Sequence, residues 1–246
     1  MADSVRVEHL AETDSTNEEA RRRALAGERG PVWIRADAQT SGRGRRGRAW
    51  ISANGNLFAT GLFTLDTGAA NAAQLSFAAA LAVAEVAREA GIDPALVSLK
   101  WPNDVLIAGR KCAGILLESG QRPGGGLWLA VGVGINLAHH PEDSERPATD
   151  FSAHGGALSP GRAVEVLARS FEAWLNRWRD HGFAPVRDAW LARAHGLGER
   201  CTVRLDTETV EGVFADLMAD GTLRLDLADG TRRFISAGDV FFPSAR

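Results

Sequence analysis

A loop rich in glycine and arginine is the first feature of the sequence that could carry out chemistry. It reads SGRGRRGRAW over residues 41–50. Alternating glycines let a backbone curve closely around an anion, and the arginines between them supply charged hydrogen-bond donors. We expect the loop to surround a phosphate, although solvated, disordered segments can have the same composition. It is not a Walker loop, because the chain contains no GxxxxGK[ST] pattern.

Lysine is the rare cation of this chain. Lysine and arginine together number 28, and only Lys100 and Lys111 are lysines. Because arginine is used everywhere else, a lysine suggests a site that needs a compact ammonium rather than a planar guanidinium. Lys111 begins the strand-like segment KCAGILLE. Gly114 weakens that strand, which indicates either close approach of a ligand or a simple bulge.

The segment KWPND, which begins at Lys100, is a second polar cluster. Pro102 cannot donate a hydrogen bond in a sheet, so a strand should end here and present Asn103 and Asp104 at its rim. Taken alone, the segment is typical of an ordinary turn. A following hairpin would bring Lys111 to the same place, so that two cations and a carboxylate converge.

The hydrophobic pattern predicts the elements that position these segments. Period-2 runs predict strands and period-3.6 runs predict helices. We expect strands at residues 5–10, 31–38 and 56–63, an antiparallel series over 96–137, and helices from 15 to 27 and over 74–90, 162–180 and 185–194. Ser15 and Glu18 have the spacing of a capping box. Three tryptophans of the later helices should face inward, namely Trp174, Trp178 and Trp190.

The last fifty residues have a different texture. Short β segments alternate with Asp-Gly turns after His195, which predicts a small β-barrel. The fold class is therefore α+β, with one domain over residues 1–195 and a second over 196–246. The segment VGVGIN lacks the third glycine and the following helix of a dinucleotide-binding fingerprint. We expect its glycines to pack against a ligand or a neighbouring strand.

Composition excludes several classes of protein. The formal net charge is -3, so no global basic field is available for nucleic acid. Cys112 and Cys201 lie far apart and have no metal-binding spacing, which suits a reducing cytosol. The N-terminus is polar, and no apolar run approaches the roughly 20 residues that span a bilayer. We therefore expect a cytoplasmic protein that does not enter a membrane.

Five motifs occur in a fixed order: DSTN, QTSGRGRRGRAW, KWPND, KCAGIL and GVGIN. Together they resemble the biotin–protein ligases, and the resemblance covers essentially the whole chain. It implies a catalytic domain built on a mixed seven-stranded sheet and a C-terminal SH3-like barrel. Some members also carry an N-terminal DNA-binding domain that makes them repressors. Little sequence precedes DSTN here, so we expect the minimal form, without DNA binding.

The resemblance implies a reaction in two steps. Biotin and ATP, with Mg²⁺ carried by the nucleotide rather than by a protein metal site, would form biotinyl-5'-AMP and pyrophosphate. The biotinyl group would then pass to a lysine of a biotin carboxyl carrier domain, of acetyl-CoA carboxylase or a related enzyme. A homodimer is a further possibility, because a sheet edge in this family serves either carrier docking or dimerisation.

The resemblance also assigns roles to individual residues. The catalytic residues would be Lys111, Arg45 and Asp104, with Asp104 orienting or deprotonating the carrier lysine. Biotin would be bound by Ser15, Thr16, Asn17, Gln39, Arg43, Gly44, Arg45, Lys111 and Gly114. ATP and the adenylate would be bound by Arg43, Arg45, Arg46, Arg48, Trp50, Lys100, Asn103 and Asn136.

Three alternatives remain at this point. A lipoate–protein ligase shares the fold and the adenylate chemistry, but Gln39 and the arginine loop argue against it. An RNA-binding module would use the arginine loop on phosphates, which the acidic net charge disfavours. A biotin sensor without activity is disfavoured because Lys100, Lys111 and Asp104 are all present.

Overall fold

The computed structural model describes all residues except 1–4, 123–124, 143–146 and 244–246. Its larger part is a seven-stranded sheet in the order β1-β2-β3-β7-β6-β5-β4. The strands are β1 (Val7–Thr13), β2 (Val32–Gln39), β3 (Leu57–Leu65), β4 (Val97–Lys100), β5 (Asp104–Ile107), β6 (Arg110–Gln121) and β7 (Leu127–Ile135). Only β1 and β2 pair in parallel, which makes the sheet mixed as expected.

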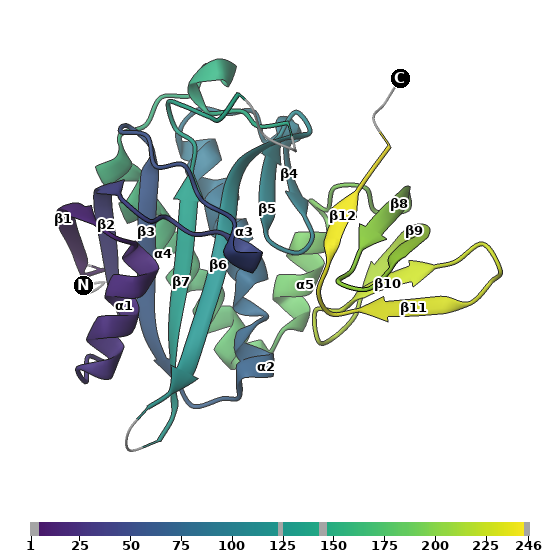
Figure 1. Cartoon of the computed structure of the whole chain (residues 1–246), viewed down its shortest axis with the longest axis horizontal. Helices are drawn as coiled ribbons and strands as arrows, with labels where there is room; N and C mark the ends of the chain where they lie inside the picture. Colours follow the sequence, from purple (N-terminus) through teal and green to yellow (C-terminus); the bar gives the residue numbers. More distant parts are fainter. Residues whose placement is uncertain (1–4, 123–124, 143–146, 244–246) are drawn as a thin grey trace.

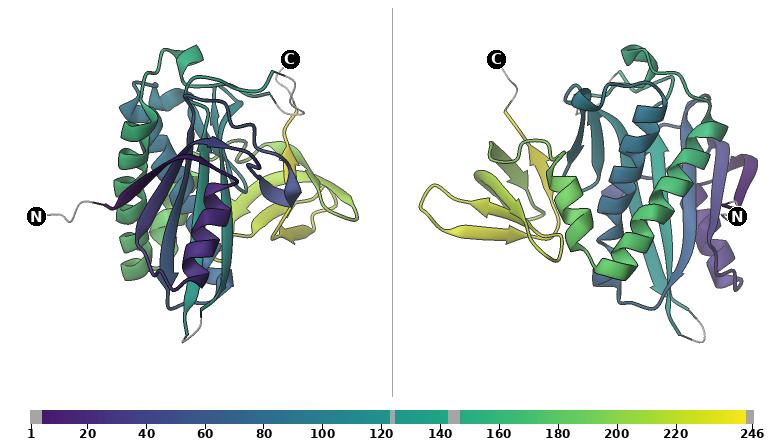
Figure 2. Two further views of the ribbon diagram at one scale, coloured as in Figure 1. Left: turned by 60° about the vertical axis from the view of Figure 1, so that its left-hand side comes forward. Right: turned by 180° about the vertical axis from the view of Figure 1, so that it is seen from behind.

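Helices cover the two faces of this sheet unequally. The helices are α1 (Thr16–Leu25), α2 (Ala69–Ala72), α3 (Leu75–Glu89), α4 (Pro160–His181) and α5 (Ala184–Leu191). The long helices α3 and α4 pack on the back of the sheet, whereas α1 lies on the front (Figures 1 and 2). Most of the front of β6 and β7 is therefore left for the loop that connects β2 to β3.

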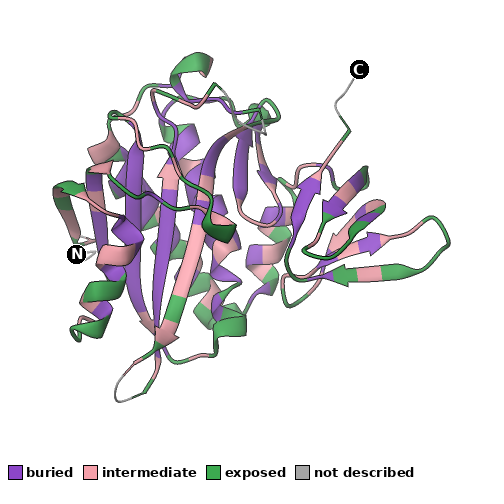
Figure 3. Ribbon diagram, in the orientation of Figure 1, coloured by how far each residue is buried: buried purple, intermediate pink, exposed green. Residues whose placement is uncertain are grey.

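Apolar residues dictate this layering. Strands β3 and β7 are buried along almost their whole length, and α3 is buried on most sides because it is rich in alanine (Figure 3). Trp33 meets Phe63 and Phe171 edge to face between the sheet and α4, with ring centroids 6.1 and 5.8 Å apart, and the tilted rings of Phe63 and Phe171 lie 5.1 Å apart. Such a core fixes the sheet rigidly behind the polar residues on its front.

Two expectations about the helices need correction. Helix α1 begins where the capping box predicts, but the Ser15 side chain makes no capping hydrogen bond. The Thr16 N–H, which a Ser15 cap would not use, donates to Gln39 Oε1 at 2.8 Å, so a long-range contact ties the first helical residue to β2. Trp190 is buried, but Trp174 and Trp178 are only partly buried at the edge of the core.

The expectation that no segment could span a bilayer was also wrong by the measure of length and composition. The helical stretch Ala69–Glu89 has 21 residues and contains an 18-residue window with a mean hydropathy of 1.3. That window is 67% buried within the fold, and the core helix of a soluble protein passes the same test. Its apolar surface is used to cover the sheet.

The C-terminal residues form a second, five-stranded antiparallel sheet in the order β11-β10-β9-β8-β12. Its strands are β8 (Arg200–Arg204), β9 (Thr209–Leu217), β10 (Leu223–Asp226), β11 (Arg232–Ile235) and β12 (Asp239–Phe241). Over the described residues β11 and β12 remain edge strands, so the sheet is not closed. Phe77 of α3, Trp190 and Phe214 of β9 form one aromatic stack that joins this sheet to the larger part.

Candidate active site

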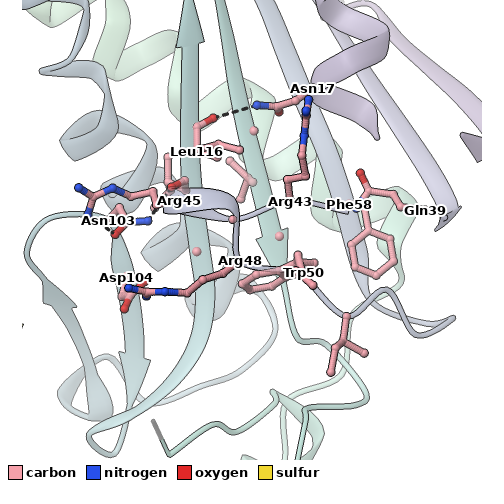
Figure 4. A pocket seen from close by; sticks show the side chains of 18 of the residues that line it. Asn17, Gln39, Arg43, Arg45, Arg48, Trp50, Phe58, Asn103, Asp104 and Leu116 are labelled. Atoms are coloured by element: carbon pink, nitrogen blue, oxygen red, sulfur yellow. Dashed lines mark hydrogen bonds between the residues drawn. The ribbon is translucent and has the colours of Figure 1, made fainter. Parts of the chain in front are cut away.

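A cavity of about 360 Å³ lies on the front of the large sheet. Its floor is formed by β6 and β7, one wall by the start of α1, and the opposite cover by the arginine loop of residues 41–50 (Figure 4). The lining includes the predicted residues Ser15, Thr16, Asn17, Gln39, Arg43, Gly44, Arg45, Arg48, Trp50, Asn103, Asp104, Lys111, Gly114 and Asn136. Five motifs that are far apart in the sequence therefore meet at one place.

Two predicted residues do not line this cavity. Arg46 points to the C-terminal sheet, where its guanidinium lies 2.7 Å from Asp206 Oδ1. Lys100 Nζ lies 5.8 Å from the centre of the Phe241 ring, also in the C-terminal sheet. Contact of either side chain with a nucleotide stays a prediction.

One end of the cavity is neutral and tightly hydrogen-bonded; we call it the neutral end, comprising Ser15, Thr16, Asn17, Gln39 and Thr60. Thr60 Oγ1 is fully buried and lies 2.7 Å from Asn17 Oδ1 and 2.8 Å from Thr16 Oγ1. Gln39 Oε1 accepts from the Thr16 N–H. Buried polar groups held in this way keep their donors and acceptors in fixed directions. The neutral end can therefore recognise an uncharged polar ring.

Asn17 ties the neutral end to the floor of the cavity. Its Nδ2 donates to Glu118 Oε2 at 2.8 Å and to the Leu116 carbonyl at 3.3 Å, a contact drawn in Figure 4. A Cβ atom on Gly132 would come within 2.0 Å of Asn17 Oδ1. The first glycine of the VGVGIN segment is therefore required by a neighbouring side chain.

The other end is charged; we call it the charged end, comprising Arg43, Arg45, Arg48, Asp104, Lys111 and Asp239. Arg45 is largely buried and donates to Asn103 Oδ1 at 3.3 Å. Burial lowers the pKa of its guanidinium, and the negative charge of Asp239 opposes that shift. Arg43 is more exposed and donates to Glu18 Oε2 of α1 at 3.1 Å. The loop is thus a folded structure rather than a disordered segment.

Lys111 lies where the two ends meet. Its Nζ is 2.5 Å from Asp104 Oδ1 and 5.5 Å from the centre of the Trp50 ring. Asp104 is only 4% exposed, so the ion pair is shielded from water. The predicted convergence of a lysine with Asp104 therefore holds for Lys111, and the two side chains are direct partners.

Trp50 lies across the floor strands and explains their remaining glycines. A Cβ on Gly134 would come within 2.5 Å of the indole, and one on Gly114 within 3.0 Å. The expected close approach at Gly114 is therefore made by a side chain of the loop. Within the described structure, the buried Nε1 of Trp50 has no hydrogen-bond partner. A Cβ on Gly134 would also come within 2.7 Å of this nitrogen, so the donor is turned toward the floor strand β7.

Several lining residues were missed by the sequence analysis. Ile51, Phe58, Pro141, Ala148 and Asp239 also line the cavity. Ala148 lies at the cavity because its two neighbours pair with Lys111. The Lys111 N–H donates to the Pro147 carbonyl and the Thr149 N–H donates to the Lys111 carbonyl, both at 2.9 Å. Asn136 Nδ2 donates to the Thr149 carbonyl at 3.0 Å and so fixes the same segment. No local sequence pattern signals this pairing, because it joins the start of β6 to a segment outside the named strands.

The comparisons with known proteins agree with this geometry. The model of the Biotin/lipoate A/B protein ligase family matches residues 11–136, and that of the Biotin protein ligase C terminal domain matches residues 196–242. The chain belongs to the biotin protein ligases. It is 42% identical over 95% of its length to a Biotin--[acetyl-CoA-carboxylase] ligase of Paracoccus denitrificans, covering 99% of that protein.

Two further biotin protein ligases support the assignment. The chain is 36% identical to a Biotin--[acetyl-CoA-carboxylase] ligase of Mycobacterium tuberculosis, over 94% of this chain and 86% of that protein. A solved biotin protein ligase from Aquifex aeolicus, in complex with biotin and ATP, superposes with a TM-score of 0.81 at 27% identity. That match covers 98% of this chain and 99% of the other. The similarity therefore extends over the large sheet and the C-terminal sheet alike.

Proposed function

We propose that this chain activates biotin with ATP and transfers the biotinyl group to a lysine of a biotin carboxyl carrier domain. The observation that carries this proposal is one cavity with a neutral, hydrogen-bonded end and a charged end that meet at Lys111. The distribution of charge in biotin matches that of the cavity, because biotin has a neutral ureido ring at one end and an anionic carboxylate at the other. The named relatives, which are ligases acting on acetyl-CoA carboxylase, support the same carrier.

In the first step a carboxylate oxygen of biotin attacks the α-phosphorus of ATP. The new oxygen–phosphorus bond gives biotinyl-5'-AMP, and the bond to pyrophosphate breaks. Negative charge gathers on the phosphate oxygens, where Arg43, Arg45 and Lys111 stabilise it by fixed positive charge. Mg²⁺ enters with ATP and offsets the charge of the triphosphate.

In the second step the neutral amine of the carrier lysine attacks the carbonyl carbon of the adenylate. AMP leaves with the bonding electrons, and the amine loses a proton. We assign acceptance of that proton, or orientation of the amine, to Asp104. Because Asp104 pairs with Lys111 here, its carboxylate becomes available when Lys111 turns toward the adenylate.

Biotin binding is assigned to the neutral end. Ser15, Thr16, Asn17 and Gln39 would hold the ureido ring, and Gly114 would lie beneath the ligand beside Trp50. Trp50 and Asn136 would lie on the adenine side. Arg46, Arg48, Lys100 and Asn103 are assigned to the phosphate side.

A lipoate–protein ligase is the rival in the same family. The cavity favours biotin, because its neutral end presents paired amide and hydroxyl groups instead of a purely apolar surface. The match to a biotin-specific C-terminal domain points the same way. Competition between lipoate and biotin for adenylation decides between the two.

We also propose the finer organisation that the resemblance implies. The catalytic domain would end near residue 195, and the five-stranded sheet of residues 196–246 would be an SH3-like barrel with an open seam. The protein would act in the cytoplasm, without DNA or a membrane. The exposed edge strand β1 would serve carrier docking or a homodimer.

The direct test is to incubate the protein with biotin, MgATP and a biotin carboxyl carrier domain and to probe the carrier with streptavidin. We expect labelling that depends on both biotin and ATP. A carrier whose acceptor lysine is replaced by arginine is the matched control. If the intact carrier also stays unlabelled while biotin-dependent exchange of pyrophosphate into ATP is absent, the proposal is wrong.

A further inference from the structure

The C-terminal sheet places one carboxylate in the cavity of the catalytic domain. Asp239, the first residue of β12, lines the cavity and is only 5% exposed. Its Oδ2 is paired with the Arg48 guanidinium of the arginine loop, and Arg46 Nη1 lies 3.7 Å from the same oxygen. A single carboxylate therefore connects two loop arginines to the C-terminal sheet.

The loop is built so that these two arginines face the C-terminal sheet. Its base is closed by the Trp50 N–H, which donates to the Gly42 carbonyl at 2.9 Å, and by the Gly44 N–H, which donates to the Arg48 carbonyl at 2.7 Å. The tip turns through Arg46, which has a left-handed φ of 57°. A non-glycine residue keeps that conformation only when its surroundings hold it.

The second contact of the loop with the C-terminal sheet is of a different kind. Arg46 also lies 2.7 Å from Asp206, whose side chain is 84% exposed. An exposed ion pair contributes little, because water and salt screen it. The Asp239 side chain is only 7% exposed, so water and salt screen its ion pairs less, although Arg48 and Arg46 are themselves 46% and 32% exposed. Asp239 is therefore expected to dominate over Asp206.

We propose that Asp239 is a positioning residue that holds the arginine loop over the charged end before the nucleotide arrives. The inference rests on the proposed function, because it assigns the loop to the phosphates of ATP. Asp239 need not touch the nucleotide; it acts through Arg46 and Arg48. The C-terminal sheet would in this way control nucleotide binding in a domain to which it contributes no strand.

An opposite effect of the same carboxylate must be weighed. Asp239 could compete with the phosphates for the arginines, so that its removal would improve nucleotide binding. Competition involves one carboxylate, whereas release of the loop restores backbone freedom to several residues that must be ordered again when ATP binds. We therefore expect preorganisation to prevail and the affinity for ATP to fall when Asp239 is neutralised.

The experiment compares Asp239→Asn with the matched control Asp206→Asn in the full chain. Limited trypsin digestion of the protein without ligands, read by mass spectrometry, reports cleavage after the arginines of residues 43–48. We expect cleavage to accelerate about fivefold to tenfold in Asp239→Asn and to be suppressed again by biotin with MgATP. In pyrophosphate exchange, the KM for ATP should rise about tenfold while the KM for biotin stays unchanged.

The controls separate positioning from general damage. Asp206→Asn should stay within about twofold of wild type in both measurements. Asp239→Glu retains the charge and should recover most of the protection from trypsin. If Asp239→Asn melts at a lower temperature, the double variant Asp239→Asn with Arg48→Gln removes the buried charge imbalance, and cleavage after Arg46 must remain fast.

Three results would overturn the inference. Unchanged cleavage in Asp239→Asn would mean that the loop is held by its own contacts. A lower KM for ATP would mean that the carboxylate competes with the phosphates. Equal rises in the KM values for ATP and biotin would mean that the whole cavity is disturbed. Trypsin cleavage reports the conformation of the loop without any substrate. A failure of the proposed function would therefore appear separately, as wild-type protein that does not label the carrier.

Discussion

The neutral end and the charged end of the cavity are held in place by different means. At the neutral end, short hydrogen bonds join buried groups of α1, β2, β3 and β6, all of which belong to regular elements. At the charged end, most cations sit on a loop and are held by ion pairs with carboxylates. A neutral ring can be recognised by a rigid surface, whereas a triphosphate needs cations that carboxylates hold in position before it binds. The predictions below test this contrast, starting with the largest effect.

The first prediction concerns the lysine where the two ends meet. Lys111→Arg should lower the rate of biotin adenylation by about 100-fold or more, a loss typical of removing one fixed donor to transition-state charge. The wider guanidinium keeps the positive charge but cannot occupy the space between Asp104, Trp50 and Gly114. Single-turnover formation of biotinyl-AMP measures the rate.

The matched measurement for this variant is biotin binding without ATP. Since the hydrogen bonds of the neutral end are made without Lys111, most of the biotin affinity should be retained. A variant that adenylates biotin at a rate close to wild type would show that any cation suffices, and the argument for a compact ammonium would fail.

The second prediction moves to the floor beneath the neutral end. Gly132→Ala should weaken biotin binding about tenfold or more, because the new Cβ would come within 2.0 Å of Asn17 Oδ1. Asn17 cannot move away without losing Thr60, Leu116 and Glu118. Isothermal titration with biotin alone measures the effect.

Gly120→Ala is the control for that variant. Gly120 lies further along the same sheet, where an added Cβ would come within 2.8 Å of the Trp128 indole, away from the cavity. It should therefore lower stability without a specific change in biotin affinity. Equal losses of biotin affinity in both variants would contradict the view that the neutral end is locally rigid.

The third prediction addresses the hydrogen bonds of the neutral end directly. Thr60→Val should lower the free energy of unfolding by about 1–3 kcal/mol, because Asn17 Oδ1 is left buried without its partner. Urea denaturation measures this loss. Thr64→Val in the same strand removes only an exposed bond to the Arg29 carbonyl and should cost about 0.5 kcal/mol or less. Similar values for the two variants would remove the basis for calling the neutral end preorganised.

The same contrast explains how much of the molecule could be predicted from sequence. The strands and the main helices follow from local patterns. The neutral end was placed by the family resemblance, because Thr16, Asn17 and Gln39 lie at the ends of periodic elements but carry no local sign of ligand binding. The glycines Gly114 and Gly132 correctly signalled a close approach. The groups that approach them are Trp50 at Gly114 and Asn17 at Gly132. They could not be read from spacing, since they depend on how the arginine loop and α1 fold onto the sheet.

The partners of the charged end were beyond local patterns. Asp239 pairs with Arg48 across 191 positions, and a Gly-Asp pair before a short strand is typical of an ordinary turn. The capping-box spacing at Ser15 marked the start of α1 correctly, but the Ser15 side chain makes no capping hydrogen bond. The contact of the Thr16 N–H with Gln39 carried no local signal. Long-range polar contacts depend on the final packing, which periodicity describes only in part.

The smallest predicted effect lies behind the charged end, at the junction of the two sheets. The His195 ring packs edge to face on Phe242 with ring centroids 5.0 Å apart. The backbone N–H of His195 donates to the Leu99 carbonyl of β4. Burial, followed by the positive charge of Lys100, lowers the pKa of His195 below its usual 6.5, and Glu199 opposes the shift weakly. The unfolded chain therefore takes up a proton at a higher pH than the folded protein does.

The free energy of unfolding should consequently fall as the pH drops through about 6.5 toward the lower folded-state value, and be insensitive to this group above that range. His195→Gln should flatten the difference in melting temperature between pH 7.5 and pH 5.5, and trypsin cleavage of the arginine loop should be unchanged at neutral pH. If His195→Gln instead released the loop as Asp239→Asn is expected to, general docking of the C-terminal sheet, and not one carboxylate, would be what holds the charged end together.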